Sequence, residues 1–123
     1  KQKKGSIIHI SSIEAFHPGT GMGVYSLTKA ALNMLTMSQA REWGKNGIRV
    51  NAIAPGLIQT KFSAALIDNK QIMDHIHHQV PAGRVGQPEE IAGLAVFLAS
   101  DAASYCTGSV YAADGGFLIS GGL

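Results

Sequence analysis

Three short segments of the chain are rich in β-branched and apolar residues, a pattern typical of buried strands. Residues 6–11 (SIIHIS) are almost continuously apolar. Residues 48–54 (IRVNAIA) alternate apolar and polar positions, then turn apolar before a Pro-Gly pair, and residues 109–113 (SVYAA) precede Asp-Gly-Gly. Strands of parallel sheets are covered on both faces and read as nearly continuous apolar runs. We therefore expect three parallel strands.

Helix-compatible segments separate these strands. Residues 24–43 contain no Gly or Pro and place apolar residues every three or four positions, which predicts the longest helix. A second helix is expected over residues 88–98, where a first-turn proline and two following glutamates suit the positive end of the helix dipole. Residues 60–80 are weakly patterned and predict one or two mobile helical turns. Residues 16–23 (FHPGTGMG) predict a loop.

The alternation of strands and helices predicts an α/β protein with a parallel sheet and right-handed crossovers. No internal repeat or low-complexity tract divides the 123 residues, so we expect one domain or a piece of one. The chain begins with Lys and enters its first predicted strand within a few residues. We expect its natural beginning to lie upstream.

The composition and net charge indicate which kinds of partner, such as membranes or nucleic acids, the chain is suited to bind. Of the residues, 46% are hydrophobic and 15% charged, which is typical of folded, soluble proteins rather than disordered chains. No segment approaches the roughly 20 uninterrupted apolar residues of a membrane helix. The formal net charge of +2 is too small for a nucleic-acid footprint. We expect no membrane and no nucleic acid as partners, and the single cysteine, Cys106, fits a reducing compartment.

Three polar side chains are candidates for chemistry at the carboxyl edge of the sheet. Tyr25 and Lys29 are four residues apart in the long predicted helix, so their side chains lie on one face. An ammonium close to a phenol stabilises the phenolate, which suits the pair to acid–base work. Ser12 follows the first strand, where ligands of open α/β sheets bind. Ser11 and Ser12 could also simply end the strand with local hydrogen bonds.

A wider set of motifs accompanies these residues. They are Ser12, thirteen residues before the Tyr25–Lys29 motif (YSLTK), NAIAPG at 51–56, Thr60, GRVGQPEEIA at 83–92 and DGG at 114–116. Together they closely resemble the short-chain dehydrogenase/reductase (SDR) family over essentially the whole chain. The resemblance implies a Rossmann-like, doubly wound parallel α/β sheet, of which this chain holds the C-terminal portion, three strands with intervening helices.

The resemblance also implies roles for individual residues. Tyr25 would be the general acid/base for the substrate oxygen, Ser12 would orient and polarise that oxygen, and Lys29 would stabilise the phenolate and bind the nicotinamide ribose. The nicotinamide end of NAD or NADP would be held by Tyr25, Lys29, Pro55, Gly56, Ile58 and Thr60. Within this set, Ile58 would act through its backbone and Thr60 through its hydroxyl.

Several motifs of the family have no counterpart in these residues. The glycine-rich dinucleotide loop, a later Asn-Asn-Ala-Gly segment and a further catalytic Asn are all missing from the 123 positions. The resemblance therefore implies that residues 1–123 are the C-terminal half of a single NAD(P)-binding domain, inactive alone. Residues 19–23 (GTGMG) lie between Ser12 and Tyr25 and space their glycines differently, so we interpret them as a substrate-side loop.

Three histidines, at positions 75, 77 and 78, suggest a metal site at first sight. A zinc site needs three or four ligands, and neither a cysteine pair nor a well-placed acidic cluster accompanies them. Polar surface on the segment after Thr60 is the better interpretation, and we expect no metal. One histidine facing substrate, with pH-sensitive binding, is a weaker alternative.

The favoured function is an NAD(P)-dependent oxidoreductase that interconverts a small alcohol and its ketone or aldehyde, as a carbonyl reductase, alcohol dehydrogenase or 3-oxoacyl reductase-like enzyme. One alternative is an SDR-type epimerase or dehydratase, which can use the same Tyr-x-x-x-Lys motif. Another is a truncated, non-catalytic oligomerisation fragment. Because the long helix of this family commonly pairs with its copy, we expect a homodimer or homotetramer, located in the cytoplasm.

Overall fold

The computed structural model of the chain describes residues 2–120. In chain order the strands and helices are β1 (Gly5–Ile10), α1 (Gly23–Trp43), β2 (Ile48–Pro55), α2 (Ala64–Ile67), α3 (Lys70–Gln79), α4 (Pro88–Ala99) and β3 (Val110–Ala113), with 3-10 turns at Ile13–Ala15, Gly44–Asn46, Asp101–Ala103 and Phe117–Ile119. The three predicted strands and the two longer predicted helices are present, with ends that differ by at most one residue from the predicted ranges.

The strands form one parallel sheet in the order β1-β2-β3. Gly5 pairs with Ile48 at the start of β1, and Pro55 pairs with Ala113 at the end of β2. The central strand β2 is the most buried element, with Val50 through Ala54 all buried. The carboxyl ends of all three strands therefore lie at the same edge of the sheet.

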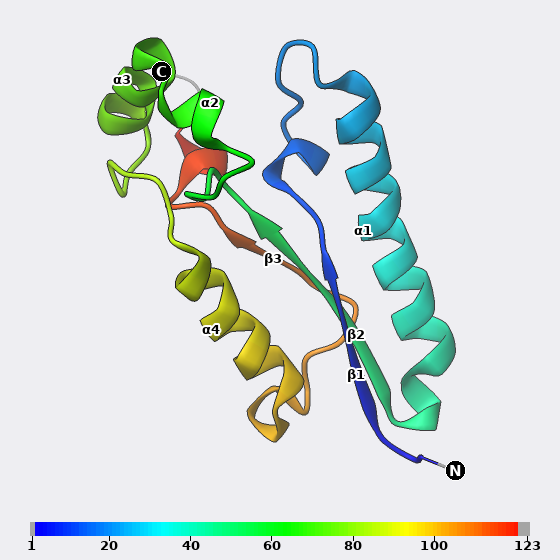
Figure 1. The fold of residues 1–123 in the computed structure, drawn as a ribbon. Helices are drawn as coiled ribbons and strands as arrows, with labels where there is room; N and C mark the ends of the chain where they lie inside the picture. Colours follow the sequence, from blue (N-terminus) through cyan, green and yellow to red (C-terminus); the bar gives the residue numbers. More distant parts are fainter. Residues whose placement is uncertain (1, 121–123) are drawn as a thin grey trace.

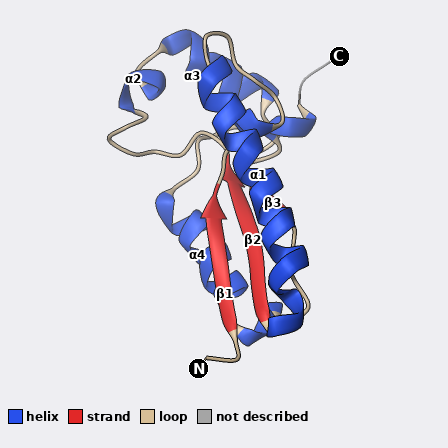
Figure 2. Cartoon of the chain, turned by 90° about the vertical axis from the view of Figure 1, so that its right-hand side faces the viewer, coloured by secondary structure: helices blue, strands red, loops and turns tan. Residues whose placement is uncertain are grey.

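The helices α1 and α4 lie on opposite faces of the sheet (Figures 1 and 2). Both crossovers step in the same direction, from β1 to β2 and from β2 to β3, so they have opposite hands. The β1-α1-β2 crossover is right-handed as predicted, whereas the prediction is wrong for β2-α4-β3, which is left-handed. That connection runs through two further helices, and its length removes the constraint that gives short crossovers a fixed hand.

The core on the α4 face centres on Ile53, Leu98 and Ala103, each fully buried. Asn51 is a buried polar residue in β2, and both polar atoms of its side-chain amide are hydrogen-bonded. Its Nδ2 donates to the Cys106 carbonyl at 2.8 Å, and its Oδ1 accepts from the Ser109 N–H at 3.2 Å. Because a satisfied buried amide fixes its neighbours, Asn51 holds the segment that leads into β3.

The segment from residue 60 to residue 80 is more regular than predicted. It forms two helices, α2 and the ten-residue α3, instead of one or two turns. Asn69 caps α3 by accepting from the Ile72 N–H at 3.2 Å, and Ile76 and Val80 are each 4% exposed. A side-chain cap and a buried apolar face are the two features that stabilise a short helix.

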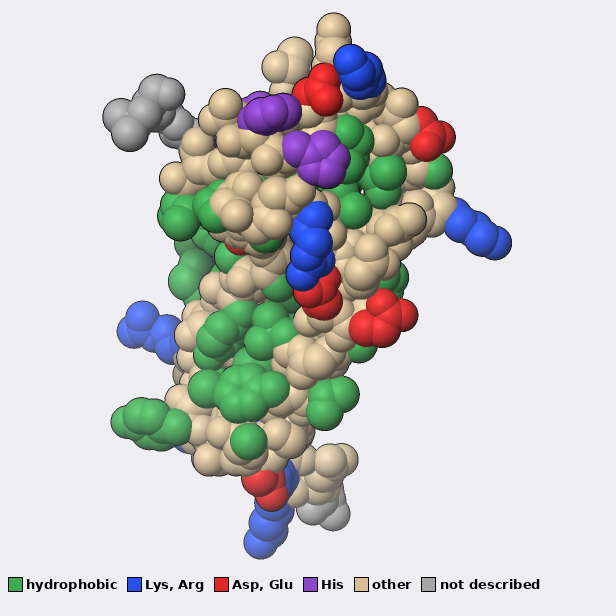
Figure 3. Space-filling model, turned by 90° about the vertical axis from the view of Figure 1, so that its left-hand side faces the viewer, with side chains coloured by type: hydrophobic (Ala, Val, Ile, Leu, Met, Phe, Trp, Pro, Cys, Tyr) green, Lys and Arg blue, Asp and Glu red, His purple; other side chains and the backbone are tan. Residues whose placement is uncertain are grey.

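Two surface features concern the whole molecule. β1 is an edge strand whose outer side has no strand partner within the described residues (Figure 2). Hydrophobic side chains also gather on the face around α4 in Figure 3, where Val96, Phe97 and Tyr105 are exposed. No helix in the described part of the chain is long and apolar enough to span a membrane.

Candidate active site

Ser12 lies just beyond β1, at the carboxyl edge of the sheet, and is 8% exposed. It precedes the 3-10 turn Ile13–Ala15, and its Oγ accepts a hydrogen bond from the Glu14 N–H at 3.1 Å. Within residues 2–120 the Ser12 hydroxyl proton has no acceptor. Ser12 therefore makes the local hydrogen bond that ends the strand and keeps its proton available for a ligand oxygen.

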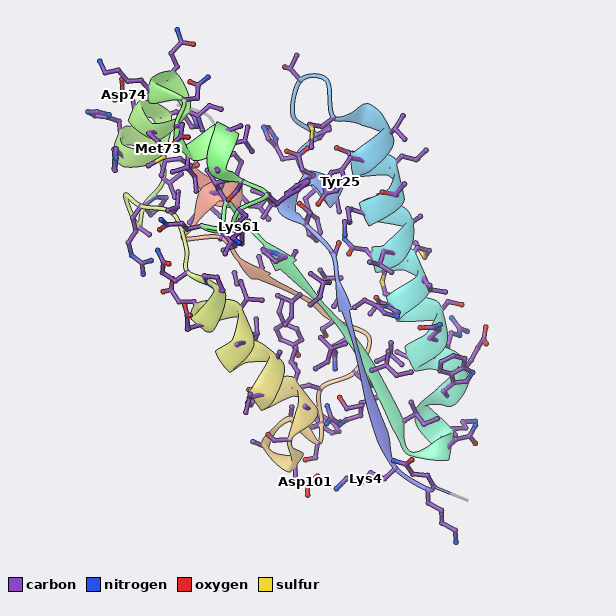
Figure 4. All side chains as sticks on the ribbon, in the orientation of Figure 1. Lys4, Tyr25, Lys61, Met73, Asp74 and Asp101 are labelled. Atoms are coloured by element: carbon purple, nitrogen blue, oxygen red, sulfur yellow. The ribbon has the colours of Figure 1, made fainter. Side chains whose placement is uncertain are left out.

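Tyr25 and Lys29 lie together at the start of α1. The Lys29 Nζ is 5.5 Å from the centroid of the Tyr25 ring, a cation–π distance, and it donates to the Ile10 carbonyl at 2.9 Å. Figure 4 shows the Tyr25 side chain extending from α1 toward the loop that follows β1. The last carbonyl of β1 thus fixes the ammonium beside the phenol.

The other tyrosines do not reach this edge of the sheet. Tyr111 lies in β3, and hydrogen bonding to Cys106, followed by burial, raises the pKa of its phenol, which keeps it protonated. Tyr105 is fully exposed near the end of α4. Tyr25 is 38% exposed, and within residues 2–120 its hydroxyl has no hydrogen-bond partner, so it is the phenol available to a ligand.

Glu14 joins the Ser12 turn to the helix that carries Tyr25. Its Oε2 accepts from the Gly19 N–H at 2.7 Å and from the Ser26 hydroxyl at 3.0 Å. Ser26 is 7% exposed and directly follows Tyr25. One carboxylate therefore fastens the loop of residues 16–23 and the first turn of α1 to the end of β1.

Pro55 and Gly56 end β2 beside the end of β3. The Gly56 N–H donates to the Ala113 carbonyl at 3.0 Å, and a Cβ on Gly56 would lie 2.8 Å from the Cα of Asp114. Real Cβ atoms essentially never approach a backbone atom so closely. The two strand ends can therefore touch only because residue 56 is glycine.

The segment after Gly56 presents polar groups at the same edge. Ile58 pairs with Gly86 in an isolated parallel bridge, and within the described residues its own N–H has no acceptor. Thr60 is exposed. Ser63 is 6% exposed. Its hydroxyl donates to the Ile58 carbonyl and accepts from the Thr60 N–H.

The polar groups of this segment can contact only a small part of a ligand as long as a dinucleotide. A free backbone N–H on Ile58 and an exposed hydroxyl on Thr60 offer a donor and a second polar group side by side. The hollow beneath this segment, lined by Leu57 and Ile58 among others, holds about 80 Å³. Typical small-molecule sites measure roughly 300–1,000 Å³, so that hollow cannot enclose a dinucleotide.

The three histidines of α3 do not converge. The Nδ1 of His77 bonds to the Gly83 carbonyl at 2.8 Å, and that of His78 bonds to the Asp74 carbonyl at 2.7 Å. The ring of His75 lies 6.2 Å from that of Phe117. Over residues 2–120, no three His, Cys, Asp or Glu side chains are grouped as a metal site requires.

The start of α4 is attached to the segment after β2. The Arg84 guanidinium binds Glu90 through two hydrogen bonds of 2.9 and 2.8 Å. These bonds, followed by one from the Gln87 N–H, lower the pKa of the Glu90 carboxyl to about 2. Because Gly86 bridges to Ile58, this cap also holds the polar segment in place.

Sequence reasoning missed Glu14 and Ser63. Each acts through a turn, so its partners are close in sequence but follow no helical or strand period. The available signals were an acidic residue two positions after Ser12 and a serine three positions after Thr60, both common in turns.

The parallel sheet, the helices on both of its faces and the polar groups at its carboxyl edge define a doubly wound, Rossmann-like α/β protein. A family model described as "Enoyl-(Acyl carrier protein) reductase" matches residues 1–118. The chain belongs to this family of short-chain dehydrogenases/reductases, as its motifs predicted.

Curated relatives and solved structures agree with this assignment. The chain is 44% identical over 118 residues to 2-dehydro-3-deoxy-D-gluconate 5-dehydrogenase of Bacillus subtilis, covering 96% of this chain and 46% of the relative. It is 40% identical over 121 residues to a tropinone reductase homolog of Arabidopsis thaliana, covering 98% of this chain and 38% of the relative. The chain thus spans less than half the length of these relatives.

Among solved structures, the fold is similar to that of a Beutenbergia cavernae protein described as an NAD(P)-dependent gluconate 5-dehydrogenase, whose structure contains NADP at low occupancy. The TM-score is 0.92 at 44% sequence identity, and the match covers 96% of this chain and 47% of that one. The Rossmann-like fold predicted from the motifs is confirmed.

Proposed function

We propose that this chain carries the proton-transfer half of an NAD(P)-dependent oxidoreductase that interconverts an alcohol and a ketone or aldehyde. The observation that carries the proposal is the position of the Lys29 ammonium, 5.5 Å from the centroid of the Tyr25 ring and bound to the Ile10 carbonyl. A fixed cation beside an available phenol is suited to moving a proton to and from a substrate oxygen.

In this proposal the three side chains divide the work. Tyr25 protonates the carbonyl oxygen during reduction and takes the proton back during oxidation. Ser12, whose Oγ accepts from the Glu14 N–H, donates its hydroxyl proton to the same oxygen. Lys29 stabilises the phenolate that forms when Tyr25 gives up its proton.

NAD or NADP would supply and accept the hydride. Its nicotinamide end would be held by Pro55, Gly56, Ile58 and Thr60, with Tyr25 and Lys29 at the ribose. The free N–H of Ile58 and the exposed Thr60 hydroxyl support this placement. Bound NADP in the structures of several similar proteins supports the cofactor class.

The names of the relatives support a small hydroxy or keto compound as the substrate class. They include gluconate 5-dehydrogenase of Gluconobacter oxydans, 38% identical over 117 residues, and tropinone reductase homologs. These names describe dehydrogenases and reductases, which favours an oxidoreductase over an epimerase or dehydratase.

We also propose that residues 1–123 form the C-terminal half of one NAD(P)-binding domain. Relatives roughly twice as long, the unpaired outer side of β1 and the small hollow at the carboxyl edge support this. Residues 1 and 121–123 of that proposed domain lie outside the described part of the chain.

A homodimer or homotetramer is proposed as the assembly. The support is an apolar surface on α1, where Val24, Leu27 and Met34 are 80%, 70% and 62% exposed. The proposed location is the cytoplasm, because the sequence holds one cysteine, Cys106, and that thiol is free. Light scattering of the purified protein and cell fractionation test these two statements.

The substitution Tyr25→Phe tests the proposed chemistry in the complete protein that contains these residues. It removes the proton donor and keeps the ring, so kcat is expected to fall at least about 100-fold, the typical contribution of a positioned acid or base. Cofactor affinity, measured by calorimetric titration, is expected to change little. A near-normal kcat in this variant overturns the proposal.

Lys29→Ala serves as the companion variant. It removes both the cation beside the phenol and the proposed ribose contact, so kcat and cofactor affinity should fall together. A loss of kcat with unchanged cofactor affinity would remove Lys29 from the cofactor site while leaving Tyr25 in its role.

A further inference from the structure

Ser63 stands at the position that normally caps a helix, yet its side chain does not cap α2. It directly precedes Ala64–Ile67, and no hydrogen bond joins its hydroxyl to that helix. Serine at this position usually accepts from a backbone N–H of the first turn. The Ser63 hydroxyl turns back instead, toward the segment that follows β2.

There it contacts Ile58 and Thr60, the two residues proposed to hold the nicotinamide end. The hydroxyl donates to the Ile58 carbonyl at 2.5 Å and accepts from the Thr60 N–H at 3.0 Å. It also lies 3.2 Å from the Thr60 Oγ1. Ser63 is 6% exposed, although Phe62 beside it is 96% exposed, so a buried serine is placed within an exposed turn.

These bonds determine what the turn offers to a ligand. A serine hydroxyl has one proton, and its shorter bond, 2.5 Å, is to the Ile58 carbonyl, with the Thr60 carbonyl a second acceptor at 3.1 Å. With that proton used, Thr60 donates in the contact between the two hydroxyls. The Thr60 Oγ1 accepts from the Ser63 N–H at 3.3 Å with one lone pair, which leaves its second lone pair available to a ligand. The Ile58 N–H is a free donor within the described residues. A donor and an acceptor side by side complement a primary carboxamide, whose oxygen accepts and whose NH₂ donates.

We propose that Ser63 is a positioning residue that sets this donor–acceptor pair for the carboxamide of the nicotinamide ring. The proposal rests on the proposed function and adds a residue to it. Ser63 does not touch the cofactor itself but fixes the orientation of the Ile58 peptide and of the Thr60 hydroxyl. Its effect is therefore confined to the nicotinamide end of the dinucleotide.

Binding measurements on the complete protein test whether Ser63 affects only the nicotinamide end of the dinucleotide. The probes are the oxidised dinucleotide that the wild type binds, NAD or NADP, and the matching ADP-ribose or 2′-phospho-ADP-ribose, which lacks the nicotinamide ring. Ser63→Ala is expected to raise the Kd of the dinucleotide about tenfold, because a net hydrogen bond contributes roughly that factor to binding. The Kd of the ring-less probe should stay unchanged.

Three further variants make the result decisive. Ser63→Thr keeps the hydroxyl and should restore dinucleotide affinity, whereas Ser63→Cys keeps the volume without a strong donor and should behave like Ser63→Ala. Ser6→Ala is the matched control, since its hydroxyl donates to the Leu98 carbonyl at 3.0 Å from the opposite end of the sheet. It should leave both Kd values unchanged.

Equal weakening of both probes by Ser63→Ala and Ser63→Cys would mean a general structural role and would overturn the proposal. An unchanged dinucleotide Kd in both variants would overturn it as well. Failure of the proposed function gives a different result, because the wild-type protein itself would then bind neither dinucleotide.

Discussion

At the scale of single residues, the candidate site depends on side chains that hold other side chains. Glu14 is the clearest case, because one carboxylate oxygen accepts from both the Gly19 N–H and the Ser26 hydroxyl. These bonds connect the Ser12 turn with the helical turn that carries Tyr25. Glu14 therefore links the two turns that carry the proposed proton donor and the proposed hydroxyl.

Glu14→Ala is predicted to lower kcat about 10- to 100-fold, because small misplacements of reacting groups carry costs of this size. Glu14→Gln keeps a side-chain oxygen that can accept both bonds and should retain most of the activity. Steady-state kinetics at saturating cofactor measure both variants.

Ser26→Ala supplies the second arm of a double-mutant cycle with Glu14→Ala. Since the two side chains share a hydrogen bond, their effects on kcat should be less than additive. Fully additive effects would show that Glu14 acts by another route.

At the scale of elements, α4 shows how a helix end can support a site. Arg84 and the Gln87 N–H both bind Glu90 in the first turn of α4, and Gly86 between them bridges to Ile58. The cap therefore stabilises the helix start and the proposed cofactor segment together.

Glu90→Gln is predicted to destabilise the protein in a pH-dependent way. The folded-state pKa of Glu90, about 2, lies below its ordinary value of 4.5. Its stabilising contribution is thus fully present above pH 4.5 and is lost as the pH falls toward 2. Urea unfolding at several pH values should show wild type and variant converging over that range. The effect should be small, because both partners are exposed.

The elements also show what could be predicted from the sequence. Apolar runs and helical periodicity located the strands, α1 and α4, because burial on a sheet imposes those periods. The length of α3 does not follow from the pattern of residues 60–80 taken as a whole, because the unpatterned residues before Asn69 obscure the four-residue spacing of Ile72, Ile76 and Val80.

For the candidate site, helix geometry predicts that Tyr25 and Lys29 share a face, and the strand pattern predicts that Ser12 follows the strand end. Their combination into one site comes from the family resemblance. The contributions of Glu14 and Ser63 could not be predicted from the sequence. They depend on how the turn after β1 and the turn before α2 fold, which brings each side chain to its hydrogen-bond partners. The left-handed second crossover was also beyond prediction, because a long connection carries no local signal of its hand.

At the scale of the whole molecule, the outer side of β1 is a sheet edge without a strand partner in the described residues. Gly5 and Ser11 donate their N–H groups to the carbonyls of Gly47 and Ile53. Since strand backbones alternate with a period of two, the N–H groups of Ser6, Ile8 and Ile10 point outward. Unpaired edges of this kind promote association between chains.

The 123-residue chain, purified alone, is predicted to self-associate as its concentration rises, as measured by light scattering. It should bind no dinucleotide tightly and show no turnover. Ser6→Pro removes one outward N–H at the edge and should reduce the association. A monomer that stays monodisperse, or one that binds NAD(P) tightly and turns over, contradicts this prediction.

The attachment of Lys29 to the Ile10 carbonyl has a consequence for how such a protein can change in evolution or design. Together with the bond between His9 and Thr36, it makes β1 and α1 one unit that carries Ser12, Tyr25 and Lys29. The α2–α3 segment makes none of these bonds, so we expect its sequence to tolerate exchange without displacing these three side chains. The loop of residues 16–23 is less exchangeable, since any replacement must still offer Glu14 a backbone N–H.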